Sequence, residues 1–386
     1  MIRAPCSKSR ILPAFRIFRV IRVAHLAYFR RFESFESFEL HISRFSRESI
    51  ISQQRRRENT PDYLALTNLQ SLGCEVECIY SDSYQQVCPY YMKKIDKIGI
   101  HIGRDRYLKS IRIHLRKLMM EFCPEVVLFV NTPKNIMDVS DINYIKQRAK
   151  TVCWFVDGIA DHQEILGYLN TFDKIYVFEH SDVAYLNSMN LEGTYLPVGY
   201  NEAFSNIKPQ KCDIDILFIG SPFHNRLKIL EQVAIESSKR GWKLKIIGPF
   251  YDRKYPWKKI IFQKKYPYIY RYLENKRVSS DVAAKLYSRT KICLNIHDTK
   301  HKSPNPRTFE ILAVGAFELI DIRDYWGALK PDYDLVTFVN SSDLIRKIDM
   351  YLKNDYKRCR IALNGNKTIK SVFAMRNLLA TMITDR

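Results

Sequence analysis

Short apolar runs alternate with stretches of helical periodicity over most of this sequence, and this alternation restricts the possible fold more than any other feature. In the first half, runs at 126–130, 152–156, 175–178 and 195–198 are rich in β-branched and aromatic residues and are bounded by polar turns. Helices are predicted between them at 139–149, 161–170 and 181–189. Strands that alternate with helices predict a parallel sheet that is covered on both faces.

A second series of the same kind begins after a linker at 206–209. Its predicted strands lie at 214–219, 244–247, 292–296, 317–320 and 336–339, and its helices lie at 223–240, 281–289 and 306–314. A chain of 386 residues also exceeds the roughly 250–300 residues that one hydrophobic core can serve. We therefore predict an α/β protein with two doubly wound, Rossmann-like domains that face a cleft, at 58–206 and 210–386. Helices near 343–353 and 370–382 would close the second domain over the junction.

The first 57 residues differ in character from the rest of the chain. They hold thirteen Lys and Arg against four Glu, a large share of the net charge of +21. Residues 11–32 predict a helix with a basic stripe of Arg16, Arg19 and Arg22, which would suit an anionic membrane surface. A transit peptide and a misassigned start are the alternatives. No opening strand is evident before the helix predicted at 60–72, and a misassigned or damaged start is the preferred explanation.

The formal charge of +21 favours an acidic partner, such as a nucleotide, an anionic lipid, an acidic glycan or a nucleic acid. The tract 251–277 interleaves Tyr and Trp with Lys and Arg, which suits single-stranded nucleic acid, a membrane interface, a glycan-binding lid or a solvated insertion. No apolar run approaches the roughly 20 residues of a membrane span, so a soluble, cytoplasmic body is expected. The nine cysteines lack zinc-ligand spacing and are expected to be buried thiols in a reducing compartment.

Ligands of open α/β sheets bind beyond the carboxyl ends of the strands, so the residues that follow strands are the candidates for binding. Gly220 and Ser221 follow the strand predicted at 214–219. A glycine lets a ligand approach the backbone, and Ser221 offers a hydroxyl. Arg226, at the start of the next helix, can meet a phosphate. A Gly-Ser turn is also common between a strand and a helix where no ligand binds.

The segment from Asn305 to Glu310 is the stronger candidate. Asn305 is a good N-cap, Pro306 is favoured at the first helical position, and the free backbone amides of a helix start attract anions. Arg307 would add its guanidinium at the same end of the helix. Glu310, one turn further on, would accept hydrogen bonds from ribose hydroxyls. Taken alone, the local sequence fits a capped surface helix better than a binding site.

Residues 305–321 resemble the nucleotide-binding motif of the CgeB-like spore-maturation glycosyltransferases, which belong to the group 1, GT-B-type enzymes. The similarity extends through 215–295, where it includes Gly220-Ser221 and Gly248-Pro249, and more weakly over 60–204. It implies transfer of a sugar from a nucleotide-sugar donor to an acceptor that is a surface or envelope glycan, a glycolipid or a protein.

The resemblance also implies roles for particular residues. By the resemblance, Glu310 binds the ribose, and Arg307 and Arg226 bind the diphosphate. At Gly220 and Gly248 it implies that the backbone approaches the donor closely. Lys302 departs from the pattern, because many group 1 enzymes carry a glutamate eight positions before the ribose-binding one.

Asp157 follows the strand predicted at 152–156 and is the candidate catalytic residue of the N-terminal domain, as a general base on an acceptor hydroxyl. Glu179 and His180 follow the next strand and are weaker candidates. Two Asp-x-Asp triplets, at 213–215 and 332–334, lie away from the edge where ligands bind, so neither a metal nor any cofactor beyond the nucleotide-sugar substrate is expected.

These features together predict a metal-independent, cytoplasmic glycosyltransferase, with peripheral contact with the inner face of an anionic membrane as a further hypothesis. The rival hypothesis is a catalytically impaired GT-B-fold protein that binds nucleic acid or anionic glycan through its basic surface. Nucleic acid is the less favoured partner.

Overall fold

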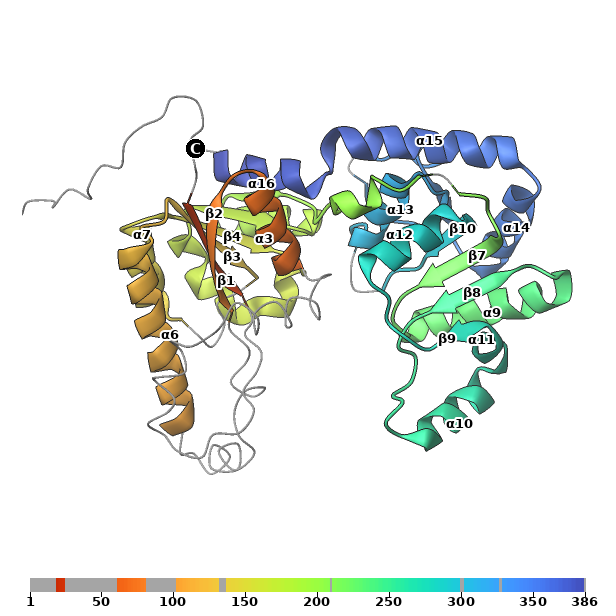
Figure 1. Ribbon diagram of the computed structural model, residues 1–386, viewed down its shortest axis with the longest axis horizontal. Coiled ribbons are helices and arrows are strands. Elements are labelled where there is room, and N and C mark those ends of the chain that lie inside the picture. Colours follow the sequence, from red (N-terminus) through yellow and green to blue (C-terminus); the bar gives the residue numbers. More distant parts are fainter. Residues whose placement is uncertain are drawn as a thin grey trace, which may run out of the picture.

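The structure is a computed structural model of the chain, and it describes residues 19–24, 61–80, 102–131, 137–208, 210–298, 302–325 and 328–384. The described residues form two six-stranded sheets, each with its own hydrophobic cores and covering helices (Figure 1). All strand pairings within both sheets are parallel. The predicted α/β fold with two Rossmann-like units is therefore confirmed.

The first sheet has the strand order β2-β1-β3-β4-β5-β6. In chain order its strands are β1 (Arg19–Ala24), β2 (Glu75–Tyr80), β3 (Val126–Val130), β4 (Lys150–Phe155), β5 (Lys174–Val177) and β6 (Gly193–Tyr195). The elements between them are α3 (Pro61–Ser71), α6 (Ile102–Glu121), α7 (Val139–Lys146), the 3₁₀ helix η1 (Ile159–Thr171) and α8 (His180–Ser188). Because its central strands are buried on both faces, β4 reads as a continuous apolar run rather than as an alternating one.

The opening strand of this sheet is present, which corrects two predictions. Residues 19–24, expected within a basic helix, form β1, which pairs with β2 on one side and with β3 on the other. The order Arg-Val-Ile-Arg-Val-Ala is rich in β-branched residues, and a parallel strand between two neighbours satisfies all of its backbone groups. The expectation that the first sheet lacks its opening strand was therefore wrong. The rest of the predicted helix at 11–32 lies outside the described residues.

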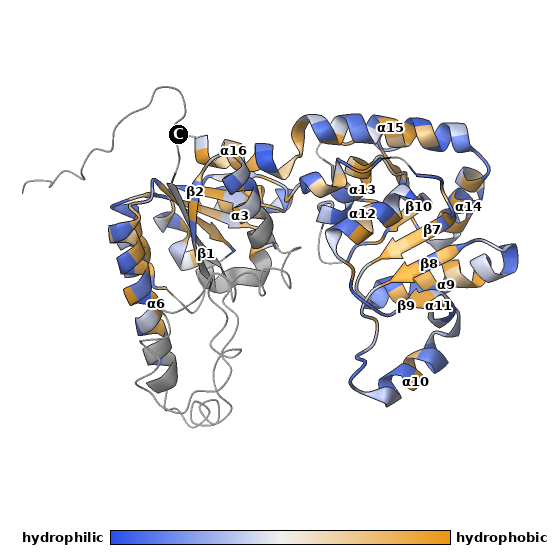
Figure 2. Ribbon diagram, viewed as in Figure 1, coloured by the Kyte–Doolittle hydropathy of each residue, from blue (hydrophilic) through white to orange (hydrophobic). Residues whose placement is uncertain are grey.

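The second sheet has the strand order β12-β11-β10-β7-β8-β9. Its strands are β7 (Ile214–Ile219), β8 (Leu244–Ile247), β9 (Leu273–Glu274), β10 (Thr290–Asn295), β11 (Glu318–Asp321) and β12 (Val336–Phe338). Its helices are α9 (His224–Arg240), α10 (Pro256–Lys265), α11 (Pro267–Tyr272), α12 (Ser280–Ser288), α13 (Pro306–Val314) and α14 (Ser341–Leu352). Figure 2 shows hydrophobic residues gathered on the strands and polar residues on the outer helices, as expected for a sheet covered on both faces.

The C-terminal helices differ from the prediction and join the two units. Helix α15 (Asp355–Val372) was missed, and the helix expected at 370–382 is α16 (Met375–Thr384). Leu378, Leu379 and Met382 of α16 are buried in a cluster with residues of the first sheet, such as Trp154. The last helices therefore extend from the C-terminal domain across the junction, and α16 packs on the N-terminal domain rather than on the C-terminal one.

Two smaller findings concern membrane spans and thiols. Among the described residues, no helix has both the length and the apolarity needed to cross a bilayer. Three of the described cysteines are buried, whereas Cys123, Cys212 and Cys359 are exposed. The prediction of buried thiols was therefore wrong for these three positions.

Candidate functional site

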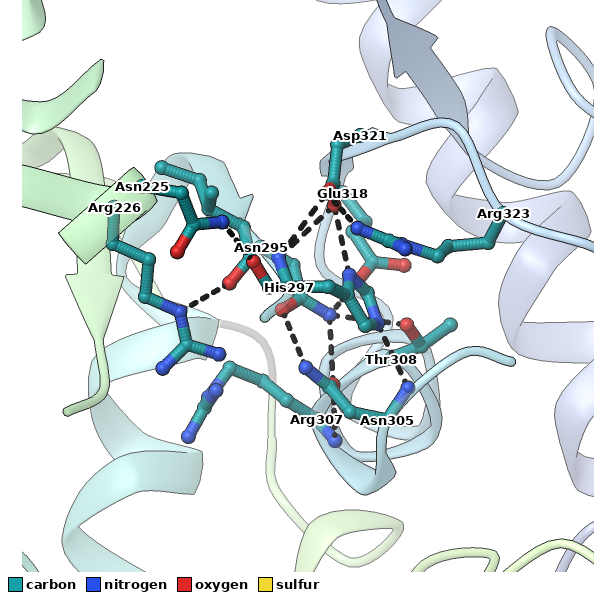
Figure 3. A network of polar contacts seen from close by, with 11 residues as sticks. Asn225, Arg226, Asn295, His297, Asn305, Arg307, Thr308, Glu318, Asp321 and Arg323 are labelled. Atoms are coloured by element: carbon teal, nitrogen blue, oxygen red, sulfur yellow. Dashed lines mark hydrogen bonds and ion pairs between the residues drawn. The ribbon is translucent and has the colours of Figure 1, made fainter. Parts of the chain in front are cut away.

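The start of helix α13 is fastened to the carboxyl end of strand β10 by a buried polar network (Figure 3). Asn295, the last residue of β10, is fully buried, and its Nδ2 lies 3.0 Å from Asn305 Oδ1, 3.1 Å from Thr308 Oγ1 and 2.9 Å from Glu318 Oε1. The carbonyl oxygen of the Asn295 amide in turn accepts from Asn305 Nδ2 at 3.1 Å. Burial raises the pKa of Glu318 to about 7. A buried network of this kind holds the helix in one position, because breaking any bond leaves a desolvated polar group.

His297 fixes the same helix start from the other side. Its Nε2 accepts from the backbone N–H of Asn305 at 2.8 Å, and its Nδ1 lies 2.8 Å from Asp321 Oδ1. Burial lowers the pKa of His297 to about 4, so the ring is neutral at physiological pH. A neutral ring that accepts at Nε2 must carry its proton at Nδ1, where it donates to Asp321. Arg323 forms an ion pair with the same carboxylate.

These contacts change the role of Asn305. The residue is the N-cap of α13, as predicted, and its Oδ1 accepts from the backbone N–H of Arg307 at 3.1 Å. The N–H of Thr308 donates to the Asn305 carbonyl at 3.1 Å, and Pro306 has no N–H to offer. The first amides of the helix are therefore occupied within the protein. Any anion bound here would depend on side chains and on the positive helix end rather than on free amides.

Two arginines lie next to each other at this helix start (Figure 3). Arg226 is buried in the first turn of α9, where Nε donates to the Ile296 carbonyl and Nη1 donates to the Ser221 carbonyl at 3.1 Å. Burial and the nearby Arg307 charge lower the pKa of Arg226 to about 10, so it remains a cation at neutral pH. Within the described residues, the buried Nε of Arg307 has no hydrogen-bond partner. Asp298 and Asp321 partly offset the charge of Arg226, and Glu310 interacts with that of Arg307, but two adjacent cations still favour a bound anion.

Glu310 lies one turn after Arg307 on α13 and is partly buried. Burial raises the pKa of its carboxyl group to about 7, while the Arg307 charge acts in the opposite direction. The carboxyl group therefore loses its proton less readily than an exposed glutamate does. A ligand that donates hydroxyl hydrogens to it would favour the ionised form.

The turns at Gly220 and Gly248 lie side by side after strands β7 and β8, and they contact each other. The N–H of Gly220 donates to the Ile247 carbonyl at 2.9 Å. A Cβ atom added to Gly248 would lie 1.9 Å from the Gly220 carbonyl oxygen. The absence of a side chain at Gly248 is thus required by the neighbouring backbone, whereas the sequence suggested that it admits a ligand. Ser221 is partly exposed next to these turns.

Asp157 lies where predicted, directly after β4, with an exposed side chain. Asn131, which follows the neighbouring strand β3, donates from Nδ2 to Asp157 Oδ2 at 3.3 Å. Two hydrogen bonds hold Asn131 to the end of β4. Its backbone N–H donates to the Trp154 carbonyl at 2.8 Å, and its Oδ1 accepts from the Val156 N–H at 2.9 Å. Its φ of 58° is one that asparagine tolerates better than most residues.

The carboxyl ends of the two sheets meet at Glu179, which follows β5. This buried carboxylate accepts from the Ser303 hydroxyl at 2.8 Å and from the backbone N–H groups of Ser303 and Lys302 at 3.1 and 3.3 Å. Ser303 Oγ also accepts from the backbone N–H of His180 at 3.3 Å. Through its Oε2 atom, Glu179 therefore joins the N-terminal domain to the loop before α13.

Aspartates of both Asp-x-Asp triplets form ion pairs or hydrogen bonds within the protein. Asp213 and Asp215 pair with Arg289 and Lys291 at the amino end of β7, and Asp334 accepts from the Lys330 N–H at 2.8 Å. Across the described ranges, no group of three His, Cys, Asp or Glu is placed to hold a metal ion.

The sequence missed the residues that position α13. Asn295, His297, Glu318 and Asp321 lie at or directly after the ends of β10 and β11, or at the start of β11. The rule that ligand-site residues follow strands would have selected His297 and Asp321. Nothing in the local sequence marks Asn295 and Glu318 as partners, because they lie on different strands.

Two parallel-sheet, Rossmann-like domains whose carboxyl ends meet have the architecture of the GT-B class of fold. A family model described as glycosyl transferase-like matches residues 226–384. The spore protein CgeB of Bacillus subtilis (strain 168) is 23% identical over 225 residues, covering 54% of this chain and 67% of CgeB.

Solved structures agree on the fold over nearly the whole chain. A glycosyltransferase from Rickettsia africae ESF-5 has a TM-score of 0.60 at 12% identity, covering 96% of this chain and 100% of that one. Anabaena Alr3699/HepE in complex with UDP also has a TM-score of 0.60, at 9% identity, covering 96% of this chain and 99% of that one. The chain therefore has the GT-B fold, and the part from Arg226 onward resembles glycosyltransferases in sequence.

Proposed function

We propose that this protein transfers a sugar from a nucleotide-sugar donor to an acceptor hydroxyl on a glycan, a lipid-linked glycan or a protein. The observation that carries the proposal is the pair Arg226 and Arg307, two adjacent cations at the positive end of α13. A diphosphate carries the charge and the oxygen atoms that such a pair binds. The family match over the same residues and the UDP complex of HepE, a protein of the same fold, support this choice of ligand.

In the proposed reaction, the bond between the anomeric carbon and the diphosphate oxygen breaks, and its electron pair leaves with the diphosphate. Arg226 and Arg307 stabilise the charge that develops there, without a metal ion. The acceptor oxygen forms the new bond to the anomeric carbon, and its proton passes to Asp157 as general base. Glu310 accepts hydrogen bonds from the ribose hydroxyls.

A thermal-shift screen against nucleotide sugars tests the proposal and identifies the donor. A ligand that binds only the folded state stabilises it by about 2.7 kcal/mol at a concentration one hundred times its Kd, so a matching donor raises the Tm measurably. We expect one nucleotide family, with UDP-sugars tried first, to raise Tm and to be turned over equally well with and without EDTA. Complete loss of turnover in EDTA would contradict metal independence, and no stabilisation by any nucleotide sugar would contradict the site.

Replacing Arg307 with Met is expected to weaken UDP binding about 10- to 100-fold, because a hydrogen bond to a charged group contributes about 1.5–3 kcal/mol. Isothermal titration calorimetry measures the effect. Arg360→Met, which removes an exposed arginine on α15, is the matched control and should bind UDP like the parent. Equal affinity in the two variants would remove Arg307 from the site.

The rival function is nucleic-acid binding by a catalytically impaired protein. The structure of the aromatic tract at 251–277 supports it less than the sequence did. Tyr251, Tyr266, Tyr270 and Tyr272 are partly buried and pack against the core of the second domain. Rings that pack in this way are not available as a row on which successive bases stack. Salt-sensitive polyanion binding that is unaffected by Arg307→Met would favour the rival.

A further inference from the structure

Helix α10 (Pro256–Lys265) exposes an apolar face that the proposed function does not explain. The helix projects from the lower edge of the C-terminal domain in the view of Figure 1 and carries both hydrophobic and hydrophilic residues (Figure 2). Trp257, Ile260 and Ile261 are 56%, 54% and 60% exposed. Residues three and four apart lie on one face of a helix, so these three side chains form a single apolar surface.

The orientation of this surface is fixed by the opposite side of the helix. Phe262 is buried, and its ring lies 5.8 Å from that of Phe250 in an edge-to-face contact and 5.3 Å from that of Tyr266. Consecutive residues of an α-helix point about 100° apart, so Phe262 lies well over 90° from Trp257. Anchoring Phe262 in the core therefore turns Trp257 and its two apolar neighbours outward.

Cations surround the apolar surface. The segment 253–273 contains seven Lys and Arg and no Asp or Glu. Lys258, Lys259, Lys264 and Lys265 lie on α10 itself and are exposed. Arg253 and Lys254 directly precede the helix and are exposed as well. A projecting helix that combines Trp and Ile on one face with lysines around it has the composition of a helix that lies in a membrane interface.

We propose that α10 docks the protein on an anionic lipid surface. Trp257, Ile260 and Ile261 enter the headgroup region, and the lysines contact anionic headgroups. Lipid fits better than nucleic acid, because two of the three exposed apolar residues are aliphatic and offer no ring for base stacking. Four of the neighbouring tyrosines, such as Tyr266, also pack on the core of the domain. The proposal does not depend on the transfer reaction, and it uses a different element from the N-terminal segment considered in the sequence.

Co-sedimentation of the full chain with lipid vesicles tests the proposal. We expect binding to vesicles of phosphatidylcholine and phosphatidylglycerol and much weaker binding to phosphatidylcholine alone. The variant W257S/I260S/I261S should bind the anionic vesicles at least about tenfold more weakly, because it removes the side chains that enter the interface. Lys264 and Lys265 lie about 20° and 80° from Trp257 around the helix, on the side of the apolar surface. K264Q/K265Q should weaken binding about tenfold as well, and the loss should be smaller at high salt.

The matched control is L363S/V372S on α15, which removes apolar side chains of similar exposure, 54% and 52%, from the opposite edge of the domain in Figure 1. It should bind like the parent. Unchanged Tm values verify that the variants are folded. Equal binding of the α10 and α15 variants, or equal binding of the parent to neutral and anionic vesicles, would overturn the proposal.

Fluorescence provides a second measurement that does not depend on weakened binding. Lipids brominated on their acyl chains should quench the tryptophan emission of the parent, and W257F, which keeps an aromatic ring, should still bind but lose that quenching. Quenching that persists in W257F would place a different surface in the lipid. Tighter binding to single-stranded RNA than to anionic vesicles, lost in W257S, would assign α10 to nucleic acid and overturn the proposal.

Discussion

Replacing Asp157 with Asn is expected to lower turnover of the donor by about 10²- to 10⁴-fold, the usual contribution of a general base. An amide of the same shape keeps the hydrogen bond with Asn131, since the oxygen of the new side chain still accepts from Nδ2. It cannot take the acceptor proton. The affinity for UDP should not change, because the proposed nucleotide-binding residues lie on the other sheet.

Turnover at saturating donor and calorimetric UDP binding separate the two effects. Glu192→Gln is the matched control, because it removes an exposed carboxylate from the same domain outside the carboxyl ends of the strands. Turnover that stays at the parental level in Asp157→Asn would remove the residue from the mechanism. A parallel fall in UDP affinity would show that the change acts on the fold.

The sequence specified most of the fold through local signals. Helix α13 begins and ends at the predicted residues, because Asn305 caps it, Pro306 opens it and Gly315 closes it with a φ of 81°. Strand β1 could not be predicted in this way. Its six residues carry arginines at a spacing that also suits a helix, and only pairing with β2 and β3 decides between the two structures.

In the candidate site, too, the sequence predicted local features but not contacts between distant residues. The sequence placed Arg226, Arg307 and Asp157 at the carboxyl ends of strands, which the structure confirms, while their roles stay predictions. It did not reveal that Asn305 is occupied by its own helix or that Glu179 binds the loop at Ser303. Both facts depend on contacts between distant residues, on which local propensities carry no information.

These contacts separate the residues that position α13 from those that are available to bind a ligand. Asn295, His297 and Asp321 use their polar groups to hold the start of α13, so they have little capacity left for a ligand. Arg307 and Glu310 project from the helix that this network holds. Side chains on a rigidly supported helix lose less conformational freedom when a ligand binds, so the network would contribute to affinity without contacting the donor.

Replacing Gly248 with Ala is expected to destabilise the C-terminal domain by at least about 3 kcal/mol or to prevent its folding. The added Cβ would lie 1.9 Å from the Gly220 carbonyl oxygen and 2.9 Å from the Phe250 ring. The first of these atoms is backbone, held by the bond from the Gly220 N–H to the Ile247 carbonyl. Relief of the clash would therefore require the ends of β7 and β8 to separate, which also displaces Arg226 from the Ser221 carbonyl.

A graded series of glycine variants measures this effect by thermal unfolding and by yield of soluble protein. Gly220→Ala should destabilise less, because its Cβ would meet the end of the Phe218 ring at 2.8 Å, and a side chain can move. Gly167→Ala should have almost no effect, since no heavy atom lies within 4 Å of the added carbon. If Gly248→Ala instead folds with a parental Tm and loses only UDP binding, the glycine serves the approach of the donor, and the backbone contact with Gly220 is not what requires it.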